Sequence, residues 1–164
     1  MTARGFTHEP PHSLTVEWYT PPHVFDALGL VFDLDPCSAG IGLDYVPARE
    51  RFTVLDDGLS QIWSGTVWCN PPYGDQTAEW LQRMKLHGDG VALVFARTGT
   101  RWWHDVAPSA DVCCFVRGRI RFINGSTRAV AKSPGADSVL LAWGSRAAHA
   151  VLRSDLGHCV TTIP

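Results

Sequence analysis

The sequence predicts an α/β domain in which helices flank a buried sheet, and two observations support this prediction. Apolar runs at residues 65–69, 91–95 and 139–143 are typical of buried strands. A helical repeat at residues 77–87 lies between the first two runs, and strands that alternate with helices favour a layered sheet. With 164 residues, 45% of them hydrophobic and 18% charged, the chain has the composition of one globular domain.

The first elements are an arm and a helix. Residues 1–17 are polar and contain Pro and His, so we expect a flexible N-terminal arm before a folded domain over residues 18–164. Thr20 is expected to cap a helix with Pro21 at its first position, because an apolar stripe of helical spacing follows these two residues. Gly29 is expected to end this helix.

Short strands and loops follow the first helix. Residues 30–34 and 52–55 are predicted to be strands, and the stretch 36–51, which Gly and Pro interrupt, is predicted to be a loop with at most one helical turn. Asp57-Gly58 is a turn signal before the buried strand at 65–69.

The second half begins with the helix at residues 77–87, in which apolar residues recur at a spacing of three and which Gly88 and Gly90 end. Periodicity and β-branched content then predict a helix at 100–106, strands at 112–116, 120–123 and 139–143, and an edge hairpin or a weakly structured tail at 151–163.

Charge is distributed unevenly along the chain. The net charge is −2, yet residues 97–132 carry seven Lys or Arg against two Asp, whereas residues 1–96 carry five basic and twelve acidic residues. A basic segment can contact phosphates. A strand with solvated arginines has the same composition, so charge alone leaves both interpretations open.

Cysteine and histidine spacing argues against a metal site. The five cysteines form no CxxC pair and the seven histidines include no HExxH, so we expect free thiols and no bound metal. No apolar run approaches the roughly 18 residues of a membrane span, and the N-terminus lacks the apolar stretch of a signal peptide. We therefore expect no membrane association and a cytoplasmic location.

One motif has a specific chemical logic. Asn70, Pro71, Pro72 and Tyr73 directly follow the strand at 65–69. Two prolines stiffen the backbone, so the Asn70 side-chain oxygen and the Pro71 carbonyl can both accept hydrogen bonds from one amino group. The Tyr73 ring can stack on the flat group that carries this amine. The motif therefore favours a site that holds a planar primary amine.

The sequence resembles the phage and prophage family of DNA N6-adenine methyltransferases, which depend on S-adenosylmethionine. Segments similar to the family's motifs occur in the family's order. They are residues 18–22 (WYTPP), 32–37 (FDLDPC), 56–59 (DDGL) and 68–74 (WCNPPYG), followed by 96–98 (ART) and 117–122 (RGRIRF).

This resemblance implies a Rossmann-like class I methyltransferase sheet with helices on both faces, abbreviated to a single domain. The implied reaction is direct methyl transfer from S-adenosylmethionine to the N6 amine of an adenine that is flipped out of DNA. The expected location is the cytoplasm of a bacterial host, and the expected partner is DNA.

The resemblance also implies roles for individual residues. The implied catalytic residues are Asn70, Pro71, Pro72 and Tyr73. The implied cofactor-binding residues are Trp18, Thr20, Pro21, Asp33, Asp35, Pro36, Cys37, Asp56, Asp57 and Asn70. The candidates for phosphate contacts with DNA are Arg97, Arg101, Arg117, Arg119 and Arg121.

General physical arguments support part of this assignment. Asp35 ends a predicted strand, and ligands of Rossmann-like sheets bind beyond the carboxyl ends of strands. Thr20 lies at a predicted helix N-terminus, which suits a carboxylate. Either Asp56 or Asp57 is expected to contact the cofactor's adenine. The glycine loop after Asp35 departs from the family's usual spacing, and Asp44 and Glu50 are candidates for the missing ribose-binding acid.

Two alternative functions remain at this point. The first is methylation of another planar amine: cytosine N4, RNA adenine or a glutamine amide. The second is a non-catalytic DNA-binding module with a degenerate cofactor pocket, which the altered glycine loop motivates. The intact Asn70–Tyr73 motif argues against the second alternative.

Overall fold

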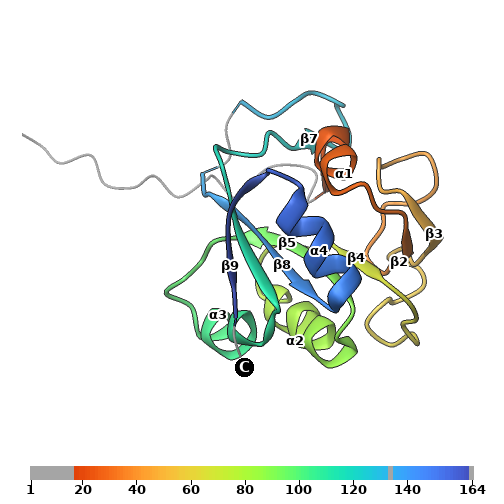
Figure 1. The fold of residues 1–164 in the computed structure, drawn as a ribbon. Coiled ribbons are helices and arrows are strands. Elements are labelled where there is room, and N and C mark those ends of the chain that lie inside the picture. The colour runs from red at the N-terminus through yellow and green to blue at the C-terminus, as the bar shows by residue number, and fades with distance from the viewer. Residues whose placement is uncertain (1–16, 133–134, 163–164) are drawn as a thin grey trace, which may run out of the picture.

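The computed structural model describes residues 17–132 and 135–162, and these form a seven-stranded mixed sheet with helices on both faces (Figure 1). The elements in chain order are β1 (Trp18–Tyr19), α1 (Pro22–Leu28), β2 (Phe32–Asp35), β3 (Ala48–Arg51), β4 (Val67–Cys69), α2 (Thr77–His87), β5 (Gly90–Phe95), α3 (Arg101–Val106), the short 3₁₀ helix η1 (Ala107–Ser109), β6 (Val112–Val116), β7 (Ile123–Asn124), β8 (Ser138–Trp143), α4 (Ser145–Arg153) and β9 (Gly157–Thr161).

The strand order of the main sheet is β3-β2-β4-β5-β8-β6-β9. The first four strands are parallel, and β8 is inserted antiparallel between β5 and β6. The chain leaves β2 for β3 on one side and later returns to β4 on the other side of β2. This reversal is a topological switch point, where Rossmann-like sheets leave a crevice for ligands. The predicted Rossmann-like α/β fold is therefore confirmed.

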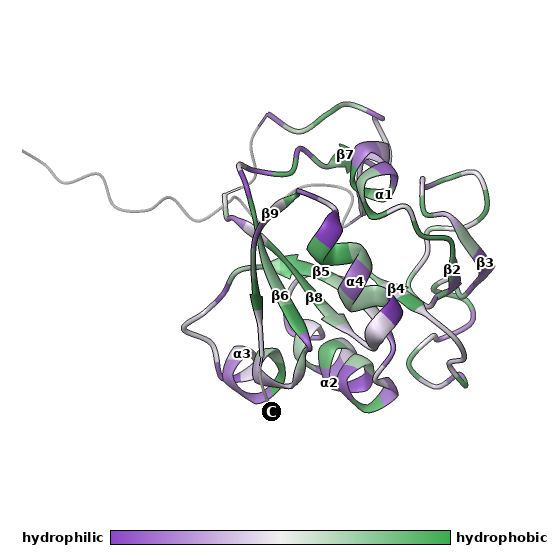
Figure 2. Cartoon of the chain, in the orientation of Figure 1, coloured by the Kyte–Doolittle hydropathy of each residue, from purple (hydrophilic) through white to green (hydrophobic). Residues whose placement is uncertain are grey.

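Two apolar layers sandwich the sheet. One layer contains residues of α1 and α4 together with Val91 and Leu93, and the other contains residues of α2 and α3 together with Ala92 and Val94. Successive β5 residues alternate between the layers because side chains alternate along a strand. Figure 2 shows the apolar colours concentrated in the central strands. Helices thus cover both faces, as predicted.

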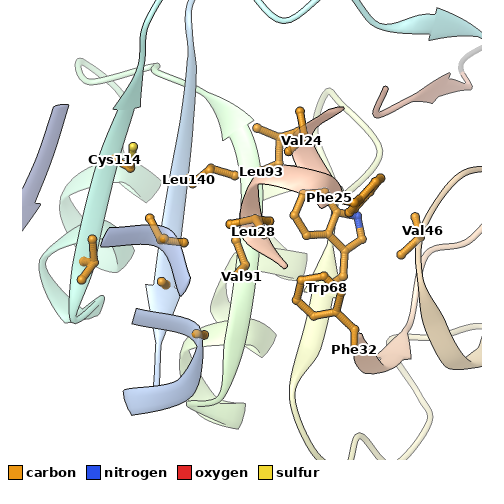
Figure 3. Packing of buried hydrophobic residues seen from close by; sticks show 14 of the residues in the cluster. Val24, Phe25, Leu28, Phe32, Val46, Trp68, Val91, Leu93, Cys114 and Leu140 are labelled. Atoms are coloured by element: carbon orange, nitrogen blue, oxygen red, sulfur yellow. The ribbon is translucent and has the colours of Figure 1, made fainter. Parts of the chain in front are cut away.

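Trp68 is a central residue of the apolar layer that also contains residues of α1 and α4. Its indole is 1% exposed and lies 4.8 Å from the Phe25 ring and 5.4 Å from the Phe32 ring, measured between centroids (Figure 3). Aromatic pairs at these separations add to the stability that burial provides. Because Trp68 is two residues before Asn70, this packing holds the start of the Asn-Pro-Pro-Tyr motif in place.

The first helix begins two residues later than its predicted cap. Pro21 is the N-cap, with φ −70° and ψ 152°, and helix α1 starts at Pro22. The prediction that Thr20 caps this helix is therefore wrong. A residue that precedes proline is driven to extended backbone, so Pro21 cannot be helical in front of Pro22. Gly29 ends the helix in the left-handed conformation, as predicted.

The predictions for residues 36–55 were also partly wrong. Strand β3 lies at Ala48–Arg51, inside the predicted loop, and residues 52–55 lead into a turn instead of forming a strand. Val54 and Leu55 are 92% and 93% exposed, so their apolar character did not indicate a buried strand. Strand β3 is a polar edge strand, which lacks the apolar alternation on which strand prediction depends.

The C-terminal part differs from its prediction as well. Residues 145–153 form helix α4, which was not predicted, and β9 follows as a single edge strand. The buried residues Ala147, Ala148 and Val151 have helical spacing that was present in the sequence. The predicted strand at 120–123 is reduced to Ile123 in β7, which pairs with β1 outside the main sheet.

Candidate active site

A pocket of about 410 Å³ lies at the carboxyl ends of β2 and β4, at the switch point of the sheet. The segment after β2, the turn at residues 57–59 and the motif after β4 all contribute to it. Its lining includes Glu17, Trp18, Tyr19, Thr20, Asp35, Pro36, Cys37, Ser38, Asp44, Val54, Asp57, Gly58, Leu59, Asn70, Pro71, Pro72, Tyr73 and Trp80.

Asp35 ends β2 in the wall of this pocket. Its side chain is buried, and its Oδ1 accepts a hydrogen bond from the Cys37 backbone N–H across 3.2 Å. Burial, followed by repulsion from Asp44, raises the pKa of Asp35 to about 7. A buried acid with such a raised pKa, set in a pocket, is a typical feature of a functional site.

Asp44 organises the loop that follows β2. Its carboxylate accepts hydrogen bonds from Ser38 Oγ at 2.7 Å and from the Val46 N–H at 3.1 Å. Arg51 Nη2 lies 3.9 Å from the same carboxylate. Asp44 lines the pocket, whereas Glu50, the other candidate for a ribose-binding acid, does not. The structure therefore favours Asp44 of the two.

Asn70 follows β4 and is held by β1. Its Nδ2 donates to the Trp18 carbonyl at 3.2 Å and to Thr20 Oγ1 at 3.4 Å. With its amide nitrogen occupied in this way, Asn70 presents its side-chain oxygen as an acceptor. Thr20, which was predicted as a helix cap, instead orients this amide. Trp18 and Thr20 both line the pocket, while Pro21 does not.

Tyr73 packs beside Asn70. Its hydroxyl donates to Asn70 Oδ1 at 3.0 Å, and its ring stacks on Phe95 with centroids 4.3 Å apart. Burial raises the pKa of this hydroxyl well above its usual range, so it stays protonated as a donor. Thr77 Oγ1 donates to the Pro72 carbonyl at 3.0 Å and thereby fixes the motif to the start of α2.

Cys37 contacts the motif from the neighbouring strand. Its Sγ lies 3.3 Å from the Asn70 carbonyl oxygen, to which it donates, and 3.9 Å from Cys69 Sγ. The hydrogen bond with Cys69 and burial raise the pKa of the Cys37 thiol well above its usual value. All five cysteines are free thiols.

The neighbouring acids Asp56 and Asp57 have different surroundings in the structure. Asp56 Oδ2 accepts from the Thr53 N–H at 2.7 Å and from Thr53 Oγ1 at 2.8 Å, and these bonds lower the pKa of Asp56. Asp57 lines the pocket and has left-handed backbone, with φ +50°. Asp56 therefore builds the turn, and Asp57 is the one of the two that lines the pocket.

Asp33 lies outside the pocket lining. It accepts a hydrogen bond from the Thr66 N–H at 2.8 Å and forms ion pairs with Arg49 at 3.2 Å and Arg146 at 3.7 Å. These contacts join β2 to neighbouring segments and favour the structural role for Asp33, one of the two roles that the sequence left open beside a cofactor contact.

The five arginines expected to bind DNA are all exposed. Arg97 and Arg117 follow β5 and β6, which run in the same direction as β4, so they emerge at the same edge of the sheet as Asn70. Arg101 pairs with Asp105 at 3.5 Å and Arg119 with Asp137 at 3.2 Å, while Arg121 donates to the Ala131 carbonyl at 3.2 Å.

Sequence reasoning gave no role to Arg128. Its guanidinium lies 5.1 Å from the centroid of the Tyr19 ring and donates to the Leu43 carbonyl. Pairing of β1 with β7 brings this distant segment to the pocket wall. No local sequence signal marks such a contact, because it depends on residues more than eighty positions apart.

The described part of the chain contains neither a metal-binding cluster nor a membrane-spanning helix. Among residues 17–132 and 135–162, no group of three His, Cys, Asp or Glu side chains could hold a metal ion. No helix in this part of the chain is long and apolar enough to cross a membrane.

The strand order, the switch-point pocket and the buried acid at the end of β2 define a Rossmann-like domain with a ligand site at its switch point. A model of the family described as DNA N-6-adenine-methyltransferase (Dam) matches residues 8–155, and the chain belongs to this family. No curated protein and no solved structure showed significant similarity to the chain. The resemblance first seen in the motifs is thus confirmed, and with it DNA adenine methylation as the general activity.

Proposed function

We propose that the protein transfers a methyl group from S-adenosylmethionine to the N6 amine of an adenine flipped out of DNA. The observation that carries this proposal is the orientation of Asn70, whose amide nitrogen is bonded to Trp18 and Thr20 while its oxygen remains an acceptor. An acceptor held in this way beside the Pro71 carbonyl matches the two hydrogens of a primary amine.

The pocket fits the proposed cofactor. A volume of about 410 Å³ lies within the range of small-molecule sites, and the pocket lies at the expected edge of the sheet. When bound there, S-adenosylmethionine supplies an activated methyl group on a sulfonium. The residues proposed to hold it are Trp18, Thr20, Asp35, Pro36, Cys37 and Asp57.

The catalytic contribution of the chain is positioning and charge stabilisation. Asn70 Oδ1 and the Pro71 carbonyl accept from the two amine hydrogens and thereby aim the nitrogen lone pair at the methyl group. The same two oxygens stabilise positive charge as it develops on the nitrogen. The proton leaves after the new N–C bond has formed, so no side chain has to remove it beforehand.

Access to a paired adenine requires extrusion of the base from the helix. One face of the Tyr73 ring packs on Phe95, so only the other face can stack on a base. Arg97 and Arg117 follow strands that end at the same edge of the sheet as Asn70, which supports a role for them in contacts with DNA phosphates.

The test is transfer of a labelled methyl group to unmethylated DNA by the wild type, Asn70→Ala and Asn70→Asp. We expect label in N6-methyladenine, a loss of about 10²–10³-fold in Asn70→Ala, and a smaller loss in Asn70→Asp, which keeps an acceptor. Glu50→Gln, a change on an exposed strand outside the pocket, is the control. Label in cytosine, RNA or protein would identify a different amine, and absence of cofactor binding would favour the non-catalytic module.

A further inference from the structure

Four carboxylates line the pocket: Glu17, Asp35, Asp44 and Asp57. None of the described residues in the lining is a lysine, arginine or histidine. The acids come from four different segments of the chain that meet at the cavity, so they do not form a single acidic stretch of sequence.

Two arginines lie behind this lining and offset part of its charge. Arg51 Nη2 is 3.9 Å from Asp44, and the Arg128 guanidinium lies over the ring of Tyr19, a lining residue. Glu17, Asp44 and Asp57 together with a partly ionised Asp35 outweigh these two cations near neutral pH, so the pocket keeps an excess of negative charge. Repulsion between Asp35 and Asp44 also shows in the raised pKa of Asp35, and a cationic ligand would relieve this repulsion.

We propose that this pocket binds the positively charged sulfonium form of the cofactor more tightly than the neutral thioether that remains after methyl transfer. The inference rests on the proposed function. In that reaction the C–S bond breaks and its electron pair stays on sulfur, so the sulfonium becomes a neutral thioether. The positive charge passes to the amine nitrogen and leaves with its proton.

The negative charge of the pocket favours the sulfonium form of the cofactor over the thioether form. S-adenosylmethionine and its demethylated product share the adenosine and the amino-acid part, so contacts to those parts contribute equally to the binding of both. They differ by one methyl group and one positive charge. Inside a partly buried, negatively charged cavity that charge is attractive, and the product loses this attraction when it forms. Product release is thus favoured by the transfer itself.

The experiment is calorimetric titration of the full chain with S-adenosylmethionine and, separately, with S-adenosylhomocysteine. We expect the sulfonium form to bind at least about tenfold more tightly. Glu17→Gln and Asp44→Asn each remove one lining charge without changing size, so each should lower this ratio. Glu50→Gln removes an acid of β3 that does not line the pocket, and should leave the ratio unchanged.

Glu17 is exposed, so Glu17→Gln tests the charge even if Asp44→Asn weakens the fold, which thermal melting would reveal. Product affinity equal to or greater than that of the sulfonium form in the wild type would overturn the inference. So would a ratio that Glu17→Gln leaves unchanged while both ligands still bind. If neither ligand binds, the proposed function itself fails, and this outcome is distinct from the other two.

Discussion

The Tyr73 hydroxyl donates a hydrogen bond to Asn70 Oδ1 across 3.0 Å. This oxygen is proposed to accept a hydrogen bond from the target amine. In this structure the Tyr73 hydroxyl therefore uses the acceptor that an amine hydrogen would need. The ring is held in position by Phe95, stacked at an interplanar angle of 16°. A bound base therefore has to displace the hydroxyl from Asn70, and the two groups compete for one acceptor.

Removal of this hydroxyl should favour substrate binding. Tyr73→Phe keeps the ring and frees Asn70 Oδ1, so we expect the KM for DNA to fall by about threefold to tenfold, the worth of one neutral hydrogen bond. Tyr73→Ala also removes the stacking surface and should lower kcat/KM by about tenfold to a hundredfold. Steady-state methyl transfer on a fixed oligonucleotide measures both. Equal losses in the two variants would instead assign the hydroxyl a catalytic role.

Thr20 is expected to act through Asn70. Thr20→Val keeps the shape of this buried side chain but removes the oxygen 3.4 Å from Asn70 Nδ2. The Asn70 amide then has one fixed partner, Trp18, and we expect kcat to fall by about tenfold because its acceptor is less well oriented. Thr20→Ser retains the oxygen and should recover most of kcat. A Thr20→Val enzyme with normal kcat would show that Trp18 alone orients the amide.

The two neighbouring acids should differ in their effect on cofactor affinity. Asp57→Ala removes a carboxylate from the pocket lining and should raise the cofactor Kd by about tenfold, the worth of a hydrogen bond to a charged group. Asp56→Ala removes the acceptor that holds Thr53 and should lower the melting temperature more than the affinity. Titration calorimetry and thermal melting separate the two effects, and the reverse pattern would mean that Asp56 contacts the cofactor.

Asp35 should make stability depend on pH. Its pKa is about 7 in the fold against 3.8 for an exposed side chain. Between these values the folded state holds a proton that the unfolded state has lost, so the contribution of Asp35 to stability falls as pH rises from about 4 to above 7. Asp35→Asn removes this effect. At pH 8 the variant should gain up to about 4 kcal/mol relative to the wild type, with little gain at pH 4.

Denaturant unfolding of both proteins at the two pH values measures this gain, and calorimetry should show weaker cofactor binding in Asp35→Asn at pH 8. A difference between the proteins that is the same at both pH values would mean that Asp35 is already ionised throughout this range.

Much of the site was predictable because its residues lie next to local signals. Asp35 ends one strand and Asn70 follows another, and a proline visible in the sequence lies just beyond each strand. Helix α2 was predicted at its observed bounds because its apolar spacing is regular. In contrast, the polar edge strand β3 was predicted as loop, and the prediction of a strand at residues 52–55 rested on apolar residues that are exposed.

The sequence by itself determined the α/β class, the order of the motifs and the chemistry of the Asn70–Tyr73 segment. Backbone stiffness and side-chain periodicity act over a few residues and are therefore visible in the chain. Only the tertiary structure decided that Asp57, and not Asp56, faces the pocket, that Asp33 joins strands, and that Thr20 holds Asn70. These contacts depend on the strand order and on the pairing of β1 with β7, which bring distant segments together through packing of the whole core.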